Sequence, residues 1–463
     1  MSTIRKIASY VLLVSAYVFT WLVAVVGHAI PRRRWKPNGR IAVTGTIFNP
    51  NWYLSHITPL TRSGVKEVIL VIDEPLQPMA GVRFVCPPKW LARLISRAGA
   101  KALWLLCVGI RYRPDLFMGY NLVAGGCTAL VAGAILGRPA CYQMTGGQLV
   151  LSTFSYDAFE KAGRFEQRIA GVIERLAVSV IKKFGLVVVR GNKGKAFLTG
   201  YGVNTDIAII TGSTKSDLQP PQADRHIDLI FLGRLVPVKQ VDQFIEIVHR
   251  VSHTVPEIKA AIVGDGPLMP DLKAEVERLK LMKNVEFLGK RADAESLLGQ
   301  ARLFVLTSKS EGLSIAMLEA MRMGTVPVVA DIGELGDFVT DSVNGWLITP
   351  NCIDEYVVRV TRVLQDKNLW KELSDRAIET SRRRCDVTAV SEAWRQSFQG
   401  VIGYVPELRV GRLWNAESAS STARTIALDN GHRGYTPKDS YGAGLLSDRR
   451  HGVTSTGEAC DRQ

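Results

Sequence analysis

Four charged residues in the second half of the chain have types and spacings that could do chemistry. Arg234 and Lys239 lie in "GRLVPVK", and Glu311 and Glu319 lie in "SKSEGLSIAMLEAM" with seven residues between them. An arginine offers a planar fork and a lysine a point charge to phosphate oxygens. A carboxylate accepts hydrogen bonds from hydroxyl groups. The set indicates a site for a phosphate-bearing ligand, although the Arg–Lys pair alone is more often two solvated basic residues.

The pattern around the two acids predicts where each one lies. "RLFVLTS" is typical of a buried strand that ends near Ser308, and a helix is expected to begin near Ser314, whose side chain can cap it. Glu311 then lies in the loop after the strand, where ligands bind in open α/β sheets. Glu319 lies inside the helix among apolar neighbours, where a carboxylate needs a partner.

Two further loops follow predicted strands. "VGDGP" allows a tight turn through Gly264 and Gly266, but it lacks the third glycine of the dinucleotide fingerprint, and alone it is more often a turn. "VEFLG" ends at Leu288 and Gly289, where exposed backbone groups could meet a planar base. Both loops are expected at the same edge of a sheet as the four charged residues.

The elements that must position these residues alternate between strand and helix. Strand patterns such as "RIAVTG" and "HIDLIFLGRL" are each followed by helical periodicity. The alternation runs twice, which predicts an α/β protein with two Rossmann-like, doubly wound domains. The expected domains are residues 37–212 and 213–385, joined through a Pro-, Ser- and Asp-rich stretch at 211–225, with a crossover helix at 386–412 and a disordered tail at 413–463.

The first 36 residues are expected to form an N-terminal transmembrane helix. Residues 8–30 carry no formal charge, and a helix of that length reaches about 35 Å, enough to cross a hydrocarbon core. More basic residues follow the segment than precede it, which places the main body in the cytoplasm. A cleaved signal peptide and a helix lying in the membrane interface are the alternatives. The apolar run at 121–136 is instead expected to be a buried helix.

Composition sets broad limits on function. Hydrophobic residues make up 47% of the chain, which indicates a globular protein. The formal charge of +15 suits phosphate-bearing partners, but a nucleic-acid role would rest on net charge alone. Seven scattered cysteines, with no Cys-x-x-Cys pair, argue against a disulfide framework or a zinc site.

The ordered set of motifs resembles the retaining family 4 glycosyltransferases of the GT-B fold. The matching stretches are "FLGRLVPVK", "VGDGP", "VEFLG", "SEGLSIAMLEAM", "MGTVPVVA" and "VNGWLITP", in this order over about 120 residues. The resemblance implies a GT-B enzyme that moves a sugar from a nucleotide-diphospho sugar to a glycan acceptor with retention of configuration. It also implies a chemistry without metal or other cofactor, and the resemblance extends more loosely over residues 40–405.

The resemblance also implies roles for single residues. Arg234 and Lys239 would grip the donor diphosphate, Glu311 would face the donor sugar, and Glu319 would bind the ribose. Further donor-binding residues would be Gly233, Leu288, Gly289, Gly312, Leu313 and Ser314. With the predicted anchor, the expected acceptor is lipid-linked, the pathway is cell-surface polysaccharide (such as exopolysaccharide) biosynthesis, and the location is the cytoplasmic face of the cell membrane.

The first domain departs from the family pattern, so its acceptor residues are less well defined. Gly45 stands alone where a Gly-Gly loop is common, and Gly146 and Gly147 are further acceptor candidates. His56 falls in a predicted helix and is interpreted as a packing or surface residue. A helix at 89–107 carries Lys89, Arg93, Arg97 and Lys101 at four-residue intervals, which is typical of a solvated face or of a membrane-facing one.

Two other readings of the donor motifs remain open. A nucleotide-sugar epimerase of the GT-B fold would share the architecture, but it lacks this spacing of the two acids. A non-catalytic scaffold subunit could keep a nucleotide pocket, although the presence of all four charged residues argues against it.

Overall fold

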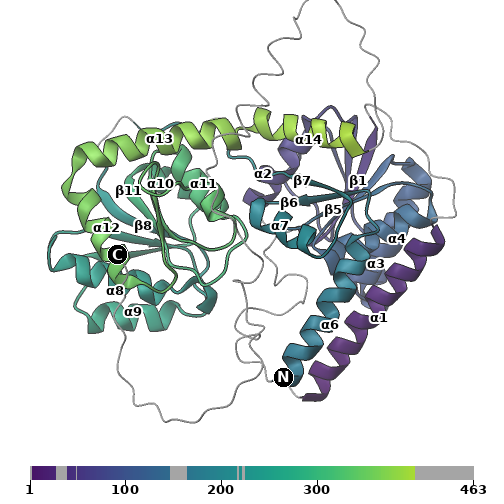
Figure 1. Cartoon of the computed structure of the whole chain (residues 1–463), viewed down its shortest axis with the longest axis horizontal. Coiled ribbons are helices and arrows are strands. Elements are labelled where there is room, and N and C mark those ends of the chain that lie inside the picture. Colours follow the sequence, from purple (N-terminus) through teal and green to yellow (C-terminus); the bar gives the residue numbers. More distant parts are fainter. Residues whose placement is uncertain are drawn as a thin grey trace, which may run out of the picture. The chain divides into compact units, whose positions relative to one another are not determined.

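The computed structural model describes residues 3–27, 39–47, 50–145, 164–215, 218–221 and 225–401. They form two separate, wholly parallel sheets with helices packed against them (Figure 1), which confirms the prediction of two doubly wound domains. The expected linker lies between the last strand of the first sheet and the first strand of the second, and its described residues belong to no helix or strand.

The first sheet has seven strands in the order β3-β2-β1-β4-β5-β6-β7. Its central strands are short, apolar and buried along their length, as expected for parallel strands covered on both faces. The strands are β1 (Arg40–Thr44), β2 (Glu67–Val71), β3 (Val82–Val85), β4 (Leu116–Tyr120), β5 (Ala140–Gln143), β6 (Leu186–Val189) and β7 (Asp206–Ile209). The helices are α1 (Thr3–Gly27), α2 (Pro50–Thr61), α3 (Lys89–Tyr112), η1 (Leu122–Gly126), α4 (Cys127–Ile135), α6 (Arg164–Ile181) and α7 (Asn192–Gly200).

The small apolar run at 121–136 forms η1 and α4, which confirms the prediction of a buried helix. Gly119 and Gly125 let this segment lie directly on β4, because a Cβ at Gly119 would stand 2.3 Å from the Gly125 carbonyl carbon. Leu130 and Ala132 of α4 are buried in the core.

Helix α3 departs from the expected row of four basic residues at Lys101, whereas Lys89, Arg93 and Arg97 are exposed. The helix is interrupted at Ile95 and Ser96, and Ser96 has φ 74°. Beyond the break, Lys101 turns inward: its side chain is 6% exposed and its Nζ lies 2.9 Å from Asp73 Oδ2. Sequence spacing predicted a continuous row because it assumed an unbroken helix.

Helix α1 is, among the described helices, the one that is long and apolar enough to cross a membrane. Length and composition alone do not separate such a span from a core helix or a signal sequence. In the structure α1 runs beside α6 and also packs on α4 (Figure 1), and it buries Leu13, Tyr17 and Ala24 in the core of the first domain. The sequence did not predict this packing.

The second sheet has six strands in the order β10-β9-β8-β11-β12-β13. The strands are β8 (Ile227–Leu232), β9 (Ala260–Val263), β10 (Val285–Gly289), β11 (Ala301–Leu306), β12 (Val326–Ala330) and β13 (Trp346–Ile348). The helices are η3 (Pro237–Lys239), α8 (Val241–Ser252), α9 (Met269–Arg278), α10 (Ala294–Gly299), α11 (Ile315–Arg322), η4 (Leu335–Asp337), α12 (Ile353–Gln365), α13 (Lys367–Cys385) and α14 (Val387–Val401).

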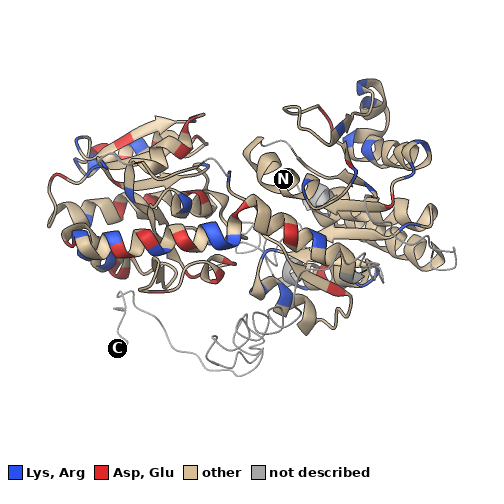
Figure 2. Cartoon of the chain, turned by 90° about the horizontal axis from the view of Figure 1, so that it is seen from above, with Lys and Arg blue, Asp and Glu red and all other residues tan. Residues whose placement is uncertain are grey.

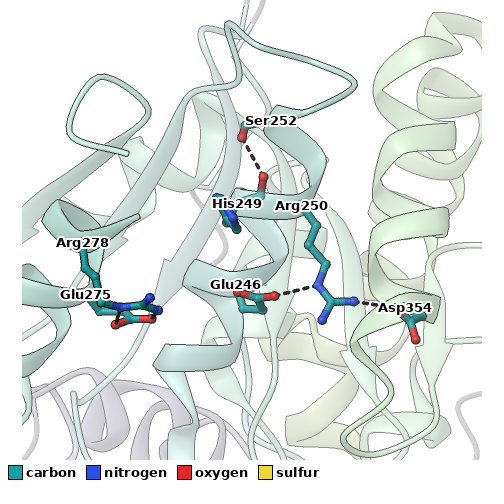
Figure 3. A network of polar contacts seen from close by, with 7 residues as sticks. All are labelled: Glu246, His249, Arg250, Ser252, Glu275, Arg278 and Asp354. Atoms are coloured by element: carbon teal, nitrogen blue, oxygen red, sulfur yellow. Dashed lines mark hydrogen bonds and ion pairs between the residues drawn. The ribbon is translucent and has the colours of Figure 1, made fainter. Parts of the chain in front are cut away.

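Surface ion pairs tie the outer helices of the second domain together. Arg250 of α8 bridges Glu246, at 2.7 Å, and Asp354 of α12, at 2.6 Å, while Glu275 and Arg278 pair within α9 (Figure 3). Acidic and basic residues are interspersed over the described helices (Figure 2), as is usual for a solvated surface. These contacts lie away from the residues predicted to do chemistry.

Helix α14 packs on α2 and buries Trp394 and Phe398 against the core of the first domain. The resemblance implied this crossover from the second domain back to the first. The tail predicted at 413–463, and the residues just after the N-terminal helix, lie outside the described residues.

Candidate active site

Three loops at the carboxyl ends of β8, β9 and β10 are joined by backbone hydrogen bonds. Gly233 N–H donates to Val263 O at 3.0 Å, and Gly264 N–H donates to Gly289 O at 2.8 Å. Leu235 N–H continues the pattern by donating to Asp265 O at 3.0 Å. The loops that carry the predicted donor residues therefore form one rigid platform.

The glycines of "VGDGP" are required by the closeness of these loops. A Cβ at Gly264 would stand 1.8 Å from Gly233 O, and one at Gly266 would stand 2.3 Å from Leu235 O. No side chain fits at such distances. The motif is thus more than a turn, because it lets the backbone after β9 lie against the backbone after β8.

Lys239 and Glu311 meet at this edge of the sheet. Lys239 closes η3, and its Nζ forms an ion pair with Glu311 Oε1; the two side chains are 18% and 12% exposed. Ser308 Oγ also donates to Glu311 Oε1 at 2.9 Å. The structure thus brings together two of the predicted catalytic residues, which lie 72 positions apart.

The backbone around this pair is held from both sides. Lys309 N–H donates to Val238 O at 2.9 Å, and Thr307 Oγ1 donates to Gln240 O at 2.8 Å. Gln240 adopts φ 46°, a left-handed conformation that favours glycine. Its side-chain amide donates to Asn351 Oδ1 at 3.0 Å, a contact that glycine could not make.

Arg234 follows β8 and is exposed. Within the part of the chain that the structure describes, no carboxylate lies within ion-pair distance of its guanidinium. It therefore lies in the same loop as Gly233, available to an anionic ligand rather than engaged in the fold.

The loop from Glu311 to Ser314 has the predicted form. Ser314 caps α11, since its Oγ accepts from Met317 N–H at 3.2 Å. A neighbouring loop fixes its path: Glu334 N–H donates to Gly312 O at 2.8 Å, and a Cβ at Gly333 would lie 2.2 Å from Glu311 O. Glu311 therefore lies in a constrained loop at the end of β11, as the sequence predicted.

Glu319 is a buried helical acid, also as predicted. It is 6% exposed, and no side-chain hydrogen bond or ion pair to its carboxylate occurs among the described residues. Burial raises its pKa to about 7; Glu295 adds to the rise, and Lys215, which pairs with Glu295, opposes it. The carboxylate lines a cavity of about 300 Å³ with Asn51, Leu54, Ser55, Thr58, Arg62, Ser213, Thr214, Lys215 and Val387.

The acceptor candidates of the first domain are only partly described. Gly45 follows β1, and a Cβ there would lie 2.8 Å from both Tyr120 Cβ and Tyr120 O, so the loop lies directly on the end of β4. Gly146 and Gly147 lie outside the described residues. No role for either loop follows from these contacts.

A buried histidine–arginine pair lies near Gly45 and was not predicted. His56 is 2% exposed, its ring stacks on Trp52 at 4.3 Å, and its Nε2 contacts Arg190 Nη2. Its Nδ1 lies 2.9 Å from Trp52 O, so Nδ1 carries the hydrogen and Nε2 accepts from Arg190. Burial, and then the Arg190 charge, hold the pKa of His56 well below its usual value. A neutral ring with both nitrogens engaged is a packing histidine, not a base.

The structure adds two residues that the sequence did not single out. The side chain of Glu334 accepts from Gly194 N–H at 2.7 Å and from Lys193 N–H at 3.1 Å, at the start of α7. Arg190 is 4% exposed, yet its Nε and Nη1 have no hydrogen-bond partner among the described residues. Neither lies in a recognisable motif, although Glu334 directly follows the "DIG" that comes after β12.

The side chains that could bind a metal and the turn at "VNGWL" are the remaining predicted features. No group of three or more His, Cys, Asp or Glu side chains in the described residues could hold a metal ion, and a chemistry without metal stays a prediction. In "VNGWL", Asn344 Nδ2 donates to Phe338 O at 2.9 Å, and Gly345 lies against Pro327 O, so this turn is structural.

The two doubly wound domains, with loops joined at the strand ends of the second, define the GT-B class of glycosyltransferase folds. A UDP-glucose complex of Anabaena Alr3699/HepE shares the fold with a TM-score of 0.62 at 18% identity, over 79% of this chain and 100% of that one. The lipopolysaccharide outer core galactosyltransferase WaaB superposes with a TM-score of 0.56 at 18% identity, over 78% and 99% of the two chains.

The second domain is similar to a known family. Residues 214–384 match the family model of the glycosyl transferases group 1. This range contains every residue of the Lys239–Glu311 site and of the three joined loops.

Curated relatives match parts of the chain. An Escherichia coli UDP-Gal:alpha-D-GlcNAc-diphosphoundecaprenol alpha-1,3-galactosyltransferase is 36% identical over 141 residues, which is 30% of this chain and 36% of that protein. A poly(ribitol-phosphate) alpha-N-acetylglucosaminyltransferase of Staphylococcus aureus is 25% identical over 54% of this chain and 50% of that protein. The chain thus aligns with half or less of the length of these relatives.

Proposed function

We propose that this protein transfers a sugar from a nucleotide-diphospho sugar to a lipid-linked glycan, with retention of configuration, in the biosynthesis of a cell-surface polysaccharide. The observation that carries the proposal is the Lys239–Glu311 pair at the carboxyl end of the second sheet. A cation for the diphosphate and a carboxylate for the sugar stand side by side on a rigid platform, within the segment that matches the family.

Donor binding uses the groups of this platform. Arg234 and Lys239 take the diphosphate, and the N-terminus of α11 adds backbone N–H groups at Gly312, Leu313 and Ser314. The backbone at Leu288 and Gly289 meets the base. Glu319 accepts hydrogen bonds from the ribose hydroxyls, which gives the buried carboxylate the donors that the protein itself does not supply.

The ion pair explains how one platform serves both binding and transfer. Without ligand, Lys239 and Glu311 neutralise each other. When the diphosphate arrives, Lys239 turns to the phosphate oxygens, and Glu311 is left beside the sugar, where positive charge develops. The bond between the anomeric carbon and the diphosphate oxygen breaks, and the acceptor hydroxyl oxygen bonds to that carbon. The proton of that hydroxyl passes to the departing diphosphate, which the two cations stabilise.

The proposed acceptor rests on the relatives and on the first domain. The aligned galactosyltransferase is named for a diphosphoundecaprenol-linked substrate, and a Campylobacter jejuni relative for a PP-undecaprenol-linked one. A lipid-linked acceptor requires a protein at the membrane, and α1 provides an apolar attachment. Basic residues follow α1 in the sequence and would be attracted to the anionic lipids of the cytoplasmic leaflet, which supports catalytic domains on the cytoplasmic face.

Two measurements test this function. UDP-, GDP- and ADP-sugars should be screened for a shift in melting temperature of the full chain in mild detergent; one base should stabilise it. Membranes that contain lipid-linked acceptors and a radiolabelled sugar of that base should then show transfer. Failure of all the nucleotides to stabilise the protein would overturn the donor site.

A variant separates catalysis from binding. Glu311→Ala should abolish transfer while the nucleoside diphosphate still stabilises the protein, because Lys239 and Arg234 remain. Glu286→Ala on the exposed side of β10 is the matched control and should transfer at the normal rate. Transfer by Glu311→Ala at near full rate would refute the assignment, and binding without transfer by the normal protein would favour a scaffold subunit.

A further inference from the structure

One side of α1 is part of the first domain's core. Its buried residues recur at intervals of four and three along the helix, which is the spacing of a face that packs against other helices. Leu13 is 8% exposed, and Tyr17, Thr20 and Ala24 are 0%, 3% and 1% exposed. Leu13, Tyr17 and Ala24 lie in the same core cluster as residues of α4, α6 and β5.

Close contacts hold α1 against α4 and α6 along its second half. A Cβ at Gly27 would lie 2.6 Å from Ala134 Cβ, so the two helices approach as closely as small residues allow. At the other neighbour, Lys183, just after α6, lies over the Trp21 ring with its Nζ 5.6 Å from the ring centroid. Because a solvent- or lipid-surrounded helix would not bury Tyr17, α1 is a fixed element of the fold.

The opposite side of α1 is exposed and almost wholly apolar. Ser15 is its one polar side chain between residues 11 and 26. The exposed apolar residues are Val11, Leu12, Val18, Phe19, Trp21, Leu22, Val25 and Val26, with exposures from 38% to 71%. A continuous apolar strip of this length on a protein surface marks a contact with a partner or a lipid phase.

Basic residues accompany this strip. Arg168, Arg175 and Lys182 lie at seven-residue intervals on α6 and at its end, and all three are exposed. Glu174, on the same helix, accepts a hydrogen bond from the Tyr201 hydroxyl. Since α6 runs beside α1 (Figure 1), an apolar strip and a row of cations lie on neighbouring helices. Anionic headgroups at the edge of a bilayer match both.

The packing of α1 on α6 argues against α1 crossing the bilayer. A crossing helix needs hydrocarbon or protein around it over about 30 Å. Helix α1 is fixed to α6 along its length, so crossing would carry the exposed charges of Arg168, Arg175 and Lys182 to hydrocarbon depth, where each is costly. A helix lying flat in one leaflet keeps the charges at headgroup level and still covers the apolar strip.

We propose that α1 binds the membrane in the plane of one leaflet, with its exposed strip about 5–10 Å deep among the acyl chains and the basic row of α6 on anionic headgroups. The first domain then lies against the bilayer, and both ends of α1 stay on the side of the catalytic domains. The partner that contacts the exposed strip of α1 is an anionic lipid surface. This inference concerns attachment only and does not depend on the transfer reaction.

The side on which the N-terminus lies tests the proposal directly. The full chain, with one epitope tag at the N-terminus and another at the C-terminus, is expressed in a bacterial host, and spheroplasts and inverted membrane vesicles are treated with protease. In-plane binding predicts that both tags survive in spheroplasts and are digested together in inverted vesicles. Digestion of the N-terminal tag in spheroplasts while the C-terminal tag survives would show a crossing helix and overturn the proposal.

A variant tests whether the outer strip does the binding. Phe19→Glu with Leu22→Glu should move most of the protein from the membrane pellet to the supernatant and reduce flotation with vesicles rich in phosphatidylglycerol at least tenfold. Val358→Glu is the matched control, since Val358 is 60% exposed on α12 of the second domain. An unchanged melting temperature shows that the double variant is folded.

Two outcomes of this second experiment would also overturn the proposal. One is a normal chain found in the supernatant, which would mean that another protein covers the strip. The other is a double variant that floats as well as the Val358→Glu control. Neither depends on transfer activity, so a failure here is distinguishable from a failure of the proposed function.

Discussion

Two buried sites, one in each domain, differ in how their charges are compensated. In the second domain, Glu311 is paired with Lys239 and accepts from Ser308, so opposite charges meet where the ligand is expected. In the first domain, Arg190 is buried against a neutral histidine, and two of its nitrogens make no hydrogen bond to the part of the chain that the structure describes. One domain carries a compensated site and the other an uncompensated cation.

The difference teaches how each site can respond to a ligand. A paired site exchanges one partner for another when the ligand binds, so binding need not change the net charge of the buried groups. An unpaired buried charge instead lowers the stability of the folded chain until something compensates it. Glu319 resembles Arg190 in this respect, because its carboxylate too is buried without a donor.

The largest expected effect comes from breaking the paired site. Lys239→Met should lower the rate of transfer by about 10³-fold, because the leaving diphosphate loses a cation in the transition state. Steady-state kinetics with the matching nucleotide sugar measure it. Lys290→Met, a change of a partly exposed lysine just after β10, should leave the rate unchanged. Equal rates in the two variants would mean that the ion pair with Glu311 is structural only.

A second prediction concerns Glu319 and pH. Its pKa of about 7 in the folded chain exceeds the ordinary value of 4.5, so the folded state holds its proton more tightly than the unfolded state does. The free energy of unfolding therefore falls as pH rises from 4.5 to 7, by an amount of up to about 3 kcal/mol for this group. Glu319→Gln, which cannot ionise, should be more stable than the normal chain at pH 8 and nearly equal to it at pH 4.5.

Urea denaturation of both proteins at the two pH values checks this. The charged neighbours, Glu295, Lys215 and Arg62, are present in both proteins, so the difference between them isolates Glu319. A pH-independent difference would mean that Glu319 is already ionised and compensated in the folded chain. Nucleoside diphosphate should stabilise the Gln variant less than the normal chain, because the carboxylate that accepts from the ribose is gone.

The contrast between local sequence patterns and distant contact partners explains how much of the site the sequence could predict. Glu311 in a loop and Glu319 in a helix follow from strand and helix patterns within a few residues of each, and both predictions are confirmed. The partners that decide their chemistry are distant: His56 and Arg190 lie 134 residues apart, and Gly194 and Glu334 lie 140 apart. Local periodicity says which face of an element is buried, but not which element covers it.

The departure of Lys101 on α3 and the unforeseen packing of α1 have the same cause. Four-residue spacing placed Lys101 with the other basic residues, but the break at Ile95 and Ser96 turned it toward Asp73. An apolar run of 23 residues predicts burial in something apolar. In the structure, one side of that helix packs on α4 and α6.

The smallest expected effect tests the uncompensated cation itself. Arg190→Met removes a buried charge at similar volume and leaves His56 Nε2 without a donor, so the free energy of unfolding should rise by about 1 kcal/mol on balance.

Arg138→Met is the matched control in the same domain. Arg138 pairs with Asp115 at 3.3 Å, their side chains are 10% and 15% exposed, and losing it should lower stability instead. Opposite signs in urea denaturation would sharpen the contrast between compensated and uncompensated charges, whereas an equal loss in both variants would show that Arg190 is compensated in the folded chain. If Arg190→Met also lowers the rate of transfer while nucleotide binding is kept, the uncompensated cation serves the acceptor, which explains why the first domain keeps a charge that costs it stability.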